Sequence, residues 1–381
     1  MHADRALHAP FVFSTCSPSL HHLSISQLLL GILPPRPADW PAVLASKRAA
    51  YAQFCTELVL ERPAGDPPPV DDDCAASAPA ATEDHPLSAA PSSAWRAFHE
   101  GTSIRDQIDR DVARTHPDMH FFSGLADGGG EEGGGGAAAA PPPNTPATAA
   151  RAALARALFV FAKLNPGVQY VQGMNELLAP PYFVFATGGG SGEGTAVPPP
   201  PTTSTTSPQP PPSAAEADAF HALVALMAEC RDWFCPALDH GSSGTGVKAT
   251  LGSLGRALAA ADPPLAAHLL GTNGVDPQFF AFRWLTLWLT QEFALPDAVR
   301  LWDGILGAEP EGGGAGGESG GRPAWRAALE RVCVAMLVAV RGELLGGDFA
   351  ANLKLLQHYP PGVDVGRLLR LADEIGGTAA C

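Results

Sequence analysis

The segment that decides the fold of this chain is residues 165–176, with the sequence NPGVQYVQGMNE. An apolar run with helical spacing precedes it, and a second apolar run begins at Leu177. Pro166 and Gly167 end the first helix, because proline lacks a backbone N–H and glycine tolerates positive φ. Gln172 is therefore expected on a connection between two packed helices, where its side chain can face a partner. The alternative interpretation is that Gln172 only caps the helix that follows.

A second polar cluster lies upstream, at residues 108–117, with the sequence IDRDVARTHP. Ile108, Asp111 and Arg114 are spaced three apart, so on a helix the Asp111 carboxylate can reach the Arg114 guanidinium. Pro117 disfavours helical geometry at the residue before it, which places Arg114 near the end of the helix. From there the Arg114 side chain can extend away from the protein. The alternative is an ordinary solvated helix end with a salt bridge.

Composition limits the classes of function. The chain has 381 residues, of which 46% are hydrophobic and 17% are charged, and this suffices for one large domain or two small ones. Acidic residues outnumber basic ones by 39 to 24, and no Lys/Arg run is present to follow a phosphate backbone. We therefore expect no nucleic-acid partner.

The cysteines indicate a reducing compartment. None of the seven forms a CxxC motif or a spacing typical of a metal site; they are Cys16, Cys55, Cys74, Cys230, Cys235, Cys333 and Cys381. Reduced thiols in a cytosolic protein are the simplest expectation. Residues 1–20 lack the pattern of a signal peptide. The longest apolar run, Val332–Val340, is too short to span a bilayer, so no direct membrane insertion is expected.

Apolar spacing predicts helices along the whole chain. No segment shows sustained period-two alternation, so the predicted fold class is all-α, with irregular multi-helix packing. Pro180 and Pro181 are expected to interrupt and kink the helix that follows Leu177. The other predicted helices are residues 20–33, 40–60, 95–112, 152–164, 216–235, 251–258, 263–270, 277–291, 296–306, 323–345, 349–358 and 363–372.

The predicted helices belong to one domain at residues 20–375, after a poorly defined segment at residues 1–19. Four segments of low complexity or polar loop composition are expected to be flexible insertions, at about 63–84, 124–148, 188–212 and 308–321. Such segments bury too little apolar surface to offset the chain entropy lost on ordering. They separate helices in the sequence, but the helices on either side can still pack together.

The two polar clusters, in this order, resemble motifs of the TBC domain of Rab GTPase-activating proteins. Residues 108–115 are similar to the arginine-finger motif of that family, and residues 170–175 are similar to its glutamine-finger motif. A third block agrees, with FRWL at 282–285, QEFAL at 291–295 and RLWD at 300–303. Further blocks, at residues 40–54, 85–87, 162–167 and 277–284, indicate one subtype within the family. The resemblance covers roughly residues 30–370.

This resemblance implies a function. The partner would be a Rab-family small GTPase in its GTP form, whose GTP hydrolysis the chain would accelerate. Arg114 and Gln172 would be the catalytic residues, supplied in trans. The chain would need no cofactor of its own, because the GTPase would carry GTP and Mg²⁺. Its location would be cytoplasmic and peripheral to endomembranes, through the Rab partner.

The resemblance also assigns supporting residues. Asp111 is expected to orient Arg114, and Arg283 and Asp303 are candidates for a supporting ion pair. The full set of supporting positions is Ile108, Asp111, Thr115, Tyr170, Gly173, Met174, Asn175, Arg283, Trp284, Trp302 and Asp303. Within this set, Tyr170, Gly173 and Met174 would shape the loop, while Arg283, Trp284, Trp302 and Asp303 would be structural.

The sequence leaves one alternative function open and gives little support to another. Where the family usually has an Arg and a Trp in its first helix, this chain has HHLSIS at residues 21–26. That departure leaves open a catalytically weak Rab-binding scaffold on the same helical fold. A hydrolase has little support, because neither a GxSxG nor an HExxH motif is present.

Overall fold

The computed structural model describes residues 27–58, 93–124, 145–188, 211–234, 246–308 and 323–379. Every regular element in these ranges is a helix and none is a strand, which confirms the predicted all-α fold class. The helices are η1 (Pro37–Asp39), α2 (Trp40–Glu57), α3 (Ala94–Ala113), α4 (His120–Ser123), α5 (Pro146–Leu164), α6 (Met174–Gly188), α7 (Ala214–Cys230), η2 (Arg231–Phe234), α8 (Val247–Ala261), α9 (Pro263–Ala266), η4 (Ala267–Thr272), η5 (Pro277–Phe279), α10 (Ala281–Thr286), α11 (Leu295–Leu306), α12 (Ala324–Ala339), α13 (Arg341–Gly346), α14 (Phe349–Gln357) and α15 (Val365–Ala379).

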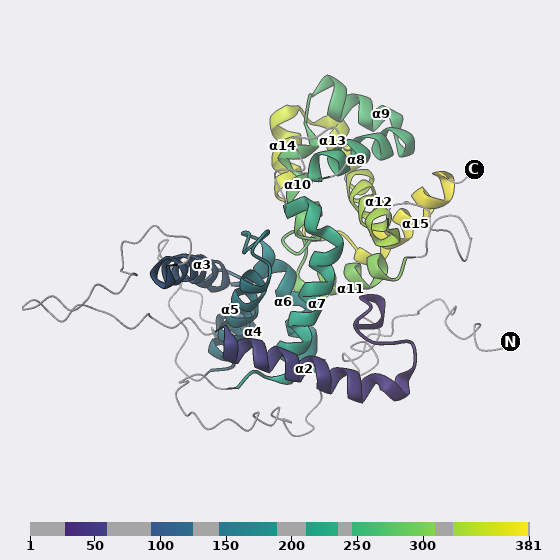
Figure 1. Cartoon of the computed structure of the whole chain (residues 1–381). Helices are drawn as coiled ribbons and strands as arrows, with labels where there is room; N and C mark the ends of the chain where they lie inside the picture. The colour runs from purple at the N-terminus through teal and green to yellow at the C-terminus, as the bar shows by residue number, and fades with distance from the viewer. Residues whose placement is uncertain are drawn as a thin grey trace, which may run out of the picture.

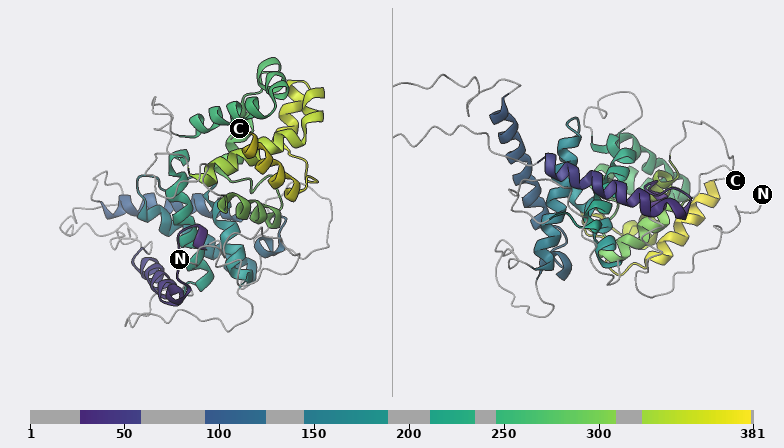
Figure 2. Two further views of the ribbon diagram at one scale, coloured as in Figure 1. Left: turned by 90° about the vertical axis from the view of Figure 1, so that its right-hand side faces the viewer. Right: turned by 60° about the horizontal axis from the view of Figure 1, so that its bottom comes forward.

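The helices form two groups that share one continuous hydrophobic core (Figure 1). In the first group α6 and α7 pack along each other, α5 packs against both, and α3 and α4 pack on α5. Figure 2 (right) shows α2 lying across the outer face of this group, where it contacts α7 and α5. The second group surrounds α12, which contacts α8, α10, α11 and α15. Because α11 also contacts α6, the two groups meet there.

Several helices begin where a polar side chain satisfies a free backbone N–H. The side-chain oxygen of the residue before the helix accepts a hydrogen bond from the third helical residue at Ser93, Thr145, Ser213, Asp262 and Asp348. The Thr145 cap corrects one prediction. α5 begins at Pro146, inside the segment expected to be a flexible insertion over 124–148, because a capping threonine is followed by a proline at the first helical position.

Most of the other predicted insertion residues lie outside the described ranges, as do residues 1–26 and 59–92. Where the structure does describe insertion ends, it differs from the prediction in small ways. Gly188 is the last residue of α6, and Ala308 lies two residues after Leu306, the last residue of α11. The expected helix at 20–33 is described only from residue 27, and its last turn ends before Gly31, whose φ of 67° belongs to the left-handed region.

The prediction of one continuous helix at 277–291 is wrong. This segment is divided into η5, α10 and a series of turns, and Trp288 and Leu289 have positive φ angles of 50° and 65°. Both side chains are nonetheless buried, and the Trp288 carbonyl oxygen accepts a hydrogen bond from Trp302 Nε1 at 2.8 Å. Tertiary packing therefore ends the helix at a place where the apolar spacing continues.

Two further predictions about continuity need correction. α6 runs without a break from Met174 to Gly188 through Pro180 and Pro181, although the prolines were expected to interrupt it. Proline has no backbone N–H, so the carbonyl groups one turn before Pro180 and Pro181 lose their helical donors. These carbonyl groups lie in a helix that is buried against α7. The predicted helix at 323–345 is two helices, because Val340 leaves helical geometry with φ −106° and ψ 22°.

A buried ionic network fastens α2, α5 and α7 together. Arg156 on α5 donates from Nε and Nη2 to the two oxygens of Glu216 on α7, each at 2.6 Å. The Tyr51 hydroxyl of α2 donates to Glu216 Oε1 at 2.6 Å. The Arg156 side chain is 14% exposed and that of Glu216 is 2% exposed, so both charges depend on each other for neutralisation.

We expect Arg156→Ala to lower the free energy of unfolding by about 3–5 kcal/mol, because it leaves the Glu216 carboxylate buried without its counter-ion. The matched control is Arg96→Ala on α3, whose ion pair with Glu100 is about half exposed and should contribute less than about 1 kcal/mol. Urea unfolding of the two variants and the wild type measures both values. Equal losses in the two variants would contradict the assignment.

Candidate functional site

Arg114 lies at the C-terminal end of α3, as the sequence predicts. It is the residue that follows the last helical residue, Ala113, and its backbone has already left helical geometry. Its Nη2 donates to Asp111 Oδ1 at 2.5 Å. The Arg114 side chain is 58% exposed, whereas that of Asp111 is 7% exposed. A buried carboxylate therefore holds one end of an otherwise accessible guanidinium.

Gln172 lies on the loop between α5 and α6, also as predicted. The loop starts where the Asn165 carbonyl accepts from Val168 N and Gln169 N, and Gln169 adopts a positive φ of 57°. Gln172 is exposed, and the described part of the chain offers its side chain no hydrogen-bond partner. The alternative in which Gln172 caps α6 requires its side chain to accept a backbone N–H, so this alternative has no support.

The two segments meet through side chains that are far apart in the sequence. The Tyr170 hydroxyl donates to Asp111 Oδ2 at 2.7 Å, so the two oxygens of Asp111 bind one donor from each segment. Asn175 makes a second connection, because its Nδ2 donates to Thr115 Oγ1 at 2.9 Å. Arg114 and Gln172 are thus carried by neighbouring segments joined by buried hydrogen bonds.

Burial and the neighbouring Asp111 carboxylate raise the pKa of Tyr170 well above its ordinary value. The hydroxyl therefore keeps its proton and remains a donor to Asp111 at physiological pH. Asn175 completes the loop, since its Oδ1 accepts from Gly173 N at 3.2 Å and lies 3.3 Å from the Tyr170 hydroxyl oxygen. Ile108 and Met174 are fully buried and anchor the two segments in the core.

Gly173 connects the loop to the third sequence block. Its φ of 105° is unfavourable for residues with a side chain, and a Cβ at this position would lie 2.7 Å from Leu287 Cδ2. Leu287 directly follows α10. The backbone of the loop therefore packs directly on the segment after α10, and only glycine allows this approach.

We expect Gly173→Ala to lower the free energy of unfolding by about 1–3 kcal/mol, through backbone strain and overlap with Leu287. Gly167→Ala in the same loop is the matched control, because its Cβ would lie 3.6 Å from Arg231 Nη2 and its φ is not in the left-handed region. The control should change stability by less than about 1 kcal/mol. Chemical denaturation measures both, and similar losses would argue against a special role for position 173.

Two residues of this site, Glu176 and His116, were not predicted from the sequence. The Glu176 Oε1 accepts from Asn175 Nδ2 at 3.1 Å, and its Oε2 lies 3.5 Å from His116 Nε2. Burial raises the pKa of the Glu176 carboxyl from 4.5 to about 7, against the lowering effect of a hydrogen bond from Gln291. The one indication in the sequence is that Glu176 is a single acidic residue at the start of an apolar helix. Such a residue is usually buried only when its carboxyl has a hydrogen-bond or ion-pair partner.

We expect wild-type stability to depend on pH through Glu176. A carboxyl with a raised folded-state pKa contributes stability that is fully present below its unfolded pKa and is lost as the pH rises through the folded value, near 7. Relative to Glu176→Gln, the wild type should therefore lose up to roughly 3 kcal/mol between about pH 5 and about pH 8, at about 1.4 kcal/mol for each pH unit between the two pKa values. Urea unfolding of both proteins across this range gives the difference, and a difference independent of pH would refute the expectation.

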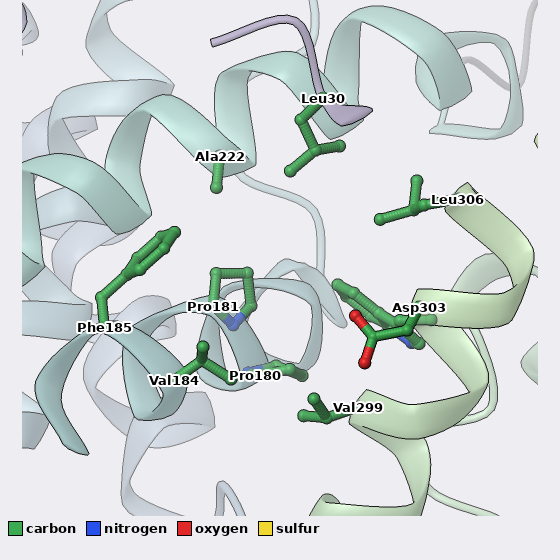
Figure 3. Close-up of a pocket in the computed structure, with 10 residues that line it drawn as sticks. Leu30, Pro180, Pro181, Val184, Phe185, Ala222, Val299, Asp303 and Leu306 are labelled. Atoms are coloured by element: carbon green, nitrogen blue, oxygen red, sulfur yellow. The ribbon is translucent and has the colours of Figure 1, made fainter. Parts of the chain in front are cut away.

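The expected ion pair between Arg283 and Asp303 is wrong. Arg283 instead donates to both oxygens of Glu292, at 2.7 and 2.9 Å, and to the Gln357 carbonyl at 2.8 Å. The turns after α10 bring Glu292 back to Arg283, which a continuous helix would not do. Asp303 lies on α11 at the edge of an apolar pocket between α6 and α11, with Pro180 and Leu306 among its neighbours (Figure 3).

Trp284 and Trp302 lie in the core, in agreement with the structural role expected for them. Trp284 is fully buried and packs edge-on against Phe280 and Tyr359, with ring centroids 5.0 and 5.7 Å apart. Trp302 holds the turn at Trp288 through its hydrogen bond to that carbonyl. These side chains support the segment on which the Gln172 loop rests.

The described ranges contain neither a candidate metal site nor a candidate membrane-spanning helix. No group of three or more His, Cys, Asp or Glu side chains there is arranged to hold a metal ion. Among the same residues, every helix is too short or too polar to cross a bilayer.

Comparison with known proteins identifies the class of this all-α domain. The chain belongs to the Rab-GTPase-TBC domain family, whose pattern matches residues 145–345. This range includes the Gln172 loop and the third sequence block, and Arg114 lies upstream of it.

Similarity to particular proteins covers about nine tenths of this chain. The chain is 32% identical to TBC1 domain family member 13 of Homo sapiens, over 92% of this chain and 88% of that protein. It is 26% identical to the GTPase-activating protein gyp1 of Schizosaccharomyces pombe, over 90% of this chain and 52% of that protein. The crystal structure of the Ypt/Rab-GAP domain of Gyp1p has the same fold, with a TM-score of 0.62, 19% identity, and coverage of 94% of this chain and 88% of that one.

Proposed function

We propose that this chain accelerates GTP hydrolysis by a Rab-family GTPase in its GTP form, and that Arg114 and Gln172 act in trans at the GTPase active site. Membership of the Rab-GTPase-TBC family and the similarity to a protein named as a GTPase-activating protein support this proposal. The observation that carries the assignment of the two residues is the Asp111 carboxylate, which binds Arg114 through one oxygen and Tyr170 of the Gln172 loop through the other.

The proposed role of Arg114 follows from the charge of the transition state. Negative charge is spread over the oxygens around the transferred phosphoryl group, so catalysis depends on positioning and electrostatic stabilisation. A guanidinium is planar and permanently charged, and it matches two oxygens at once. In Ras, an arginine supplied by the activating protein raises the rate roughly 10³–10⁵-fold, which corresponds to about 4–7 kcal/mol of barrier.

The proposed role of Gln172 is to orient the attacking water. Its amide can accept a hydrogen bond from the water and donate one to a phosphate oxygen or to the GTPase backbone. Tyr170, Gly173, Met174 and Asn175 fix the loop, so Gln172 would meet the GTPase with its backbone already ordered.

GTP and Mg²⁺ belong to the GTPase in this proposal, and the chain supplies no cofactor. Encounter with a membrane would come through the Rab partner, at the cytoplasmic face of endomembranes. Thr115 and Ile108 would position Arg114 indirectly. Thr115 accepts a hydrogen bond from Asn175, and Ile108 is buried in the core.

We expect Arg114→Lys to lower the stimulated single-turnover rate of GTP hydrolysis at least about 10³-fold while the fold is kept, because an ammonium cannot make the bidentate planar contact. Gln172→Ala should cost nearly as much. Arg110→Ala is the matched control, since Arg110 is an exposed arginine on the same helix whose Nε donates to the Asp106 carbonyl. Phosphate release from a panel of purified Rabs is the measurement, with circular dichroism to check folding.

The outcomes separate the possible roles. Full activity of Arg114→Lys would remove Arg114 from the mechanism. Wild-type turnover with Gln172→Ala would assign water orientation to a residue of the GTPase. Binding of GTP-loaded Rab without any stimulation by the wild type would instead favour the scaffold alternative.

A further inference from the structure

Three segments that are distant in sequence meet at one buried carboxyl, that of Glu176. It lies four residues after Gln172, accepts a hydrogen bond from Asn175 and faces His116, which lies two residues after Arg114. The Gln291 side chain, from the turns after α10, lies near enough to lower the pKa of this carboxyl. Glu176 is therefore in contact with the arginine segment, the glutamine segment and the segment that supports both.

We propose that Glu176 is a positioning residue which, in its neutral form, holds the Arg114 segment against the Gln172 segment, and that ionisation of Glu176 loosens this arrangement. The catalytic consequence of this inference rests on the proposed function. Its structural part does not, because it can be tested on the chain without a GTPase.

His116 is fixed so that it can serve as the partner. Its backbone has a φ of 41°, a left-handed conformation that turns the chain immediately after the Arg114 segment. Its ring stacks on Phe122 with centroids 5.8 Å apart and planes inclined by 30°. The side chains of His116 and Glu176 are only 12% and 8% exposed, so neither can turn to solvent without opening the site.

The protonation states favour a neutral contact. Burial lowers the pKa of His116, so the imidazole is uncharged near neutral pH, although Asp118 opposes this effect. Burial raises the pKa of Glu176 to about 7, so a large fraction of the carboxyl keeps its proton there. His116 Nε2 is buried and has no hydrogen-bond partner in the described ranges, and Glu176 Oε2 lies 3.5 Å from it. A protonated Glu176 could donate to this lone pair after a small approach, while its other oxygen still accepts from Asn175.

Ionisation changes the balance of charge around Arg114. The charged and titratable groups that face Glu176 are Asp111 and Arg114 from the end of α3, His116 beyond it, and Tyr170 from the loop. An ionised Glu176 would place a second negative charge near Asp111, which it repels, and would no longer have a proton to offer to His116 Nε2. It would also attract the Arg114 guanidinium towards the protein and away from a phosphate.

A glutamine at this position gives a sharp comparison. The amide of Glu176→Gln can donate to His116 and accept from Asn175, as the protonated carboxyl does, but it cannot ionise. If the carboxyl contributed only to stability, the wild type would still lose stability as the pH rises, but the stimulated rates of the folded wild type and the folded variant would respond identically to pH. A different response therefore isolates the positioning role from a merely structural one.

The test is the stimulated single-turnover rate at saturating chain concentration, divided by the intrinsic rate of the same Rab at each pH, from about pH 6 to about pH 8.5. The wild-type ratio should fall at least about fivefold across this range, with a midpoint near 7. The ratio for Glu176→Gln should change less than about twofold and equal the wild-type value at the acidic end. Glu330→Gln on α12, another buried glutamate and one outside the site, is the matched control and should keep the wild-type profile.

Amide hydrogen exchange of the chain without a GTPase separates the two proposals. After correction for intrinsic exchange, residues 111–116 and 170–176 of the wild type should be less protected at about pH 8 than at about pH 6, while Glu176→Gln should show no such change. Equal pH responses of wild type and variant in exchange would overturn the positioning role whatever the rates. The expected exchange response without stimulation of any Rab would uphold the positioning role and reject the proposed function.

Discussion

The carboxylate of Asp111 is the constraint on which the functional surface depends. A carboxylate withdrawn from water is stable only when its oxygens are hydrogen bonded or paired with a charge. Here one oxygen binds Arg114 and the other binds the Tyr170 hydroxyl, 59 positions further along the chain. The need to satisfy one buried group therefore fixes the relative placement of two segments that local structure alone would leave independent.

The site combines a rigid interior with accessible ends. Asn175, Thr115 and Tyr170 form a buried hydrogen-bonded network below the surface, while Arg114 and Gln172 are exposed above it. This network holds the loop backbone in one conformation, so less conformational entropy is lost when a partner binds. Burial beside this network also raises the pKa of the Glu176 carboxyl to about 7.

Backbone geometry does as much as side-chain chemistry in building this surface. His116, Gln169 and Gly173 all have positive φ angles, and they lie where α3 ends and where α5 turns towards α6. Gly173 also allows the loop to rest directly on Leu287, so the turns after α10 support the site from below. The broken helix around Trp288 is part of the same construction, since it brings Gln291 to Glu176 and Glu292 to Arg283.

The sequence by itself determined the helical class, most helix positions, and the placement of Arg114 at a helix end and Gln172 on a loop, because apolar spacing, proline and glycine act within a few residues. Only the tertiary structure decided that Arg283 pairs with Glu292, that the helix before Trp288 ends early, and that Glu176 faces His116. Those features depend on contacts between residues distant in the chain, where the burial of charge and the filling of the core outweigh local preference.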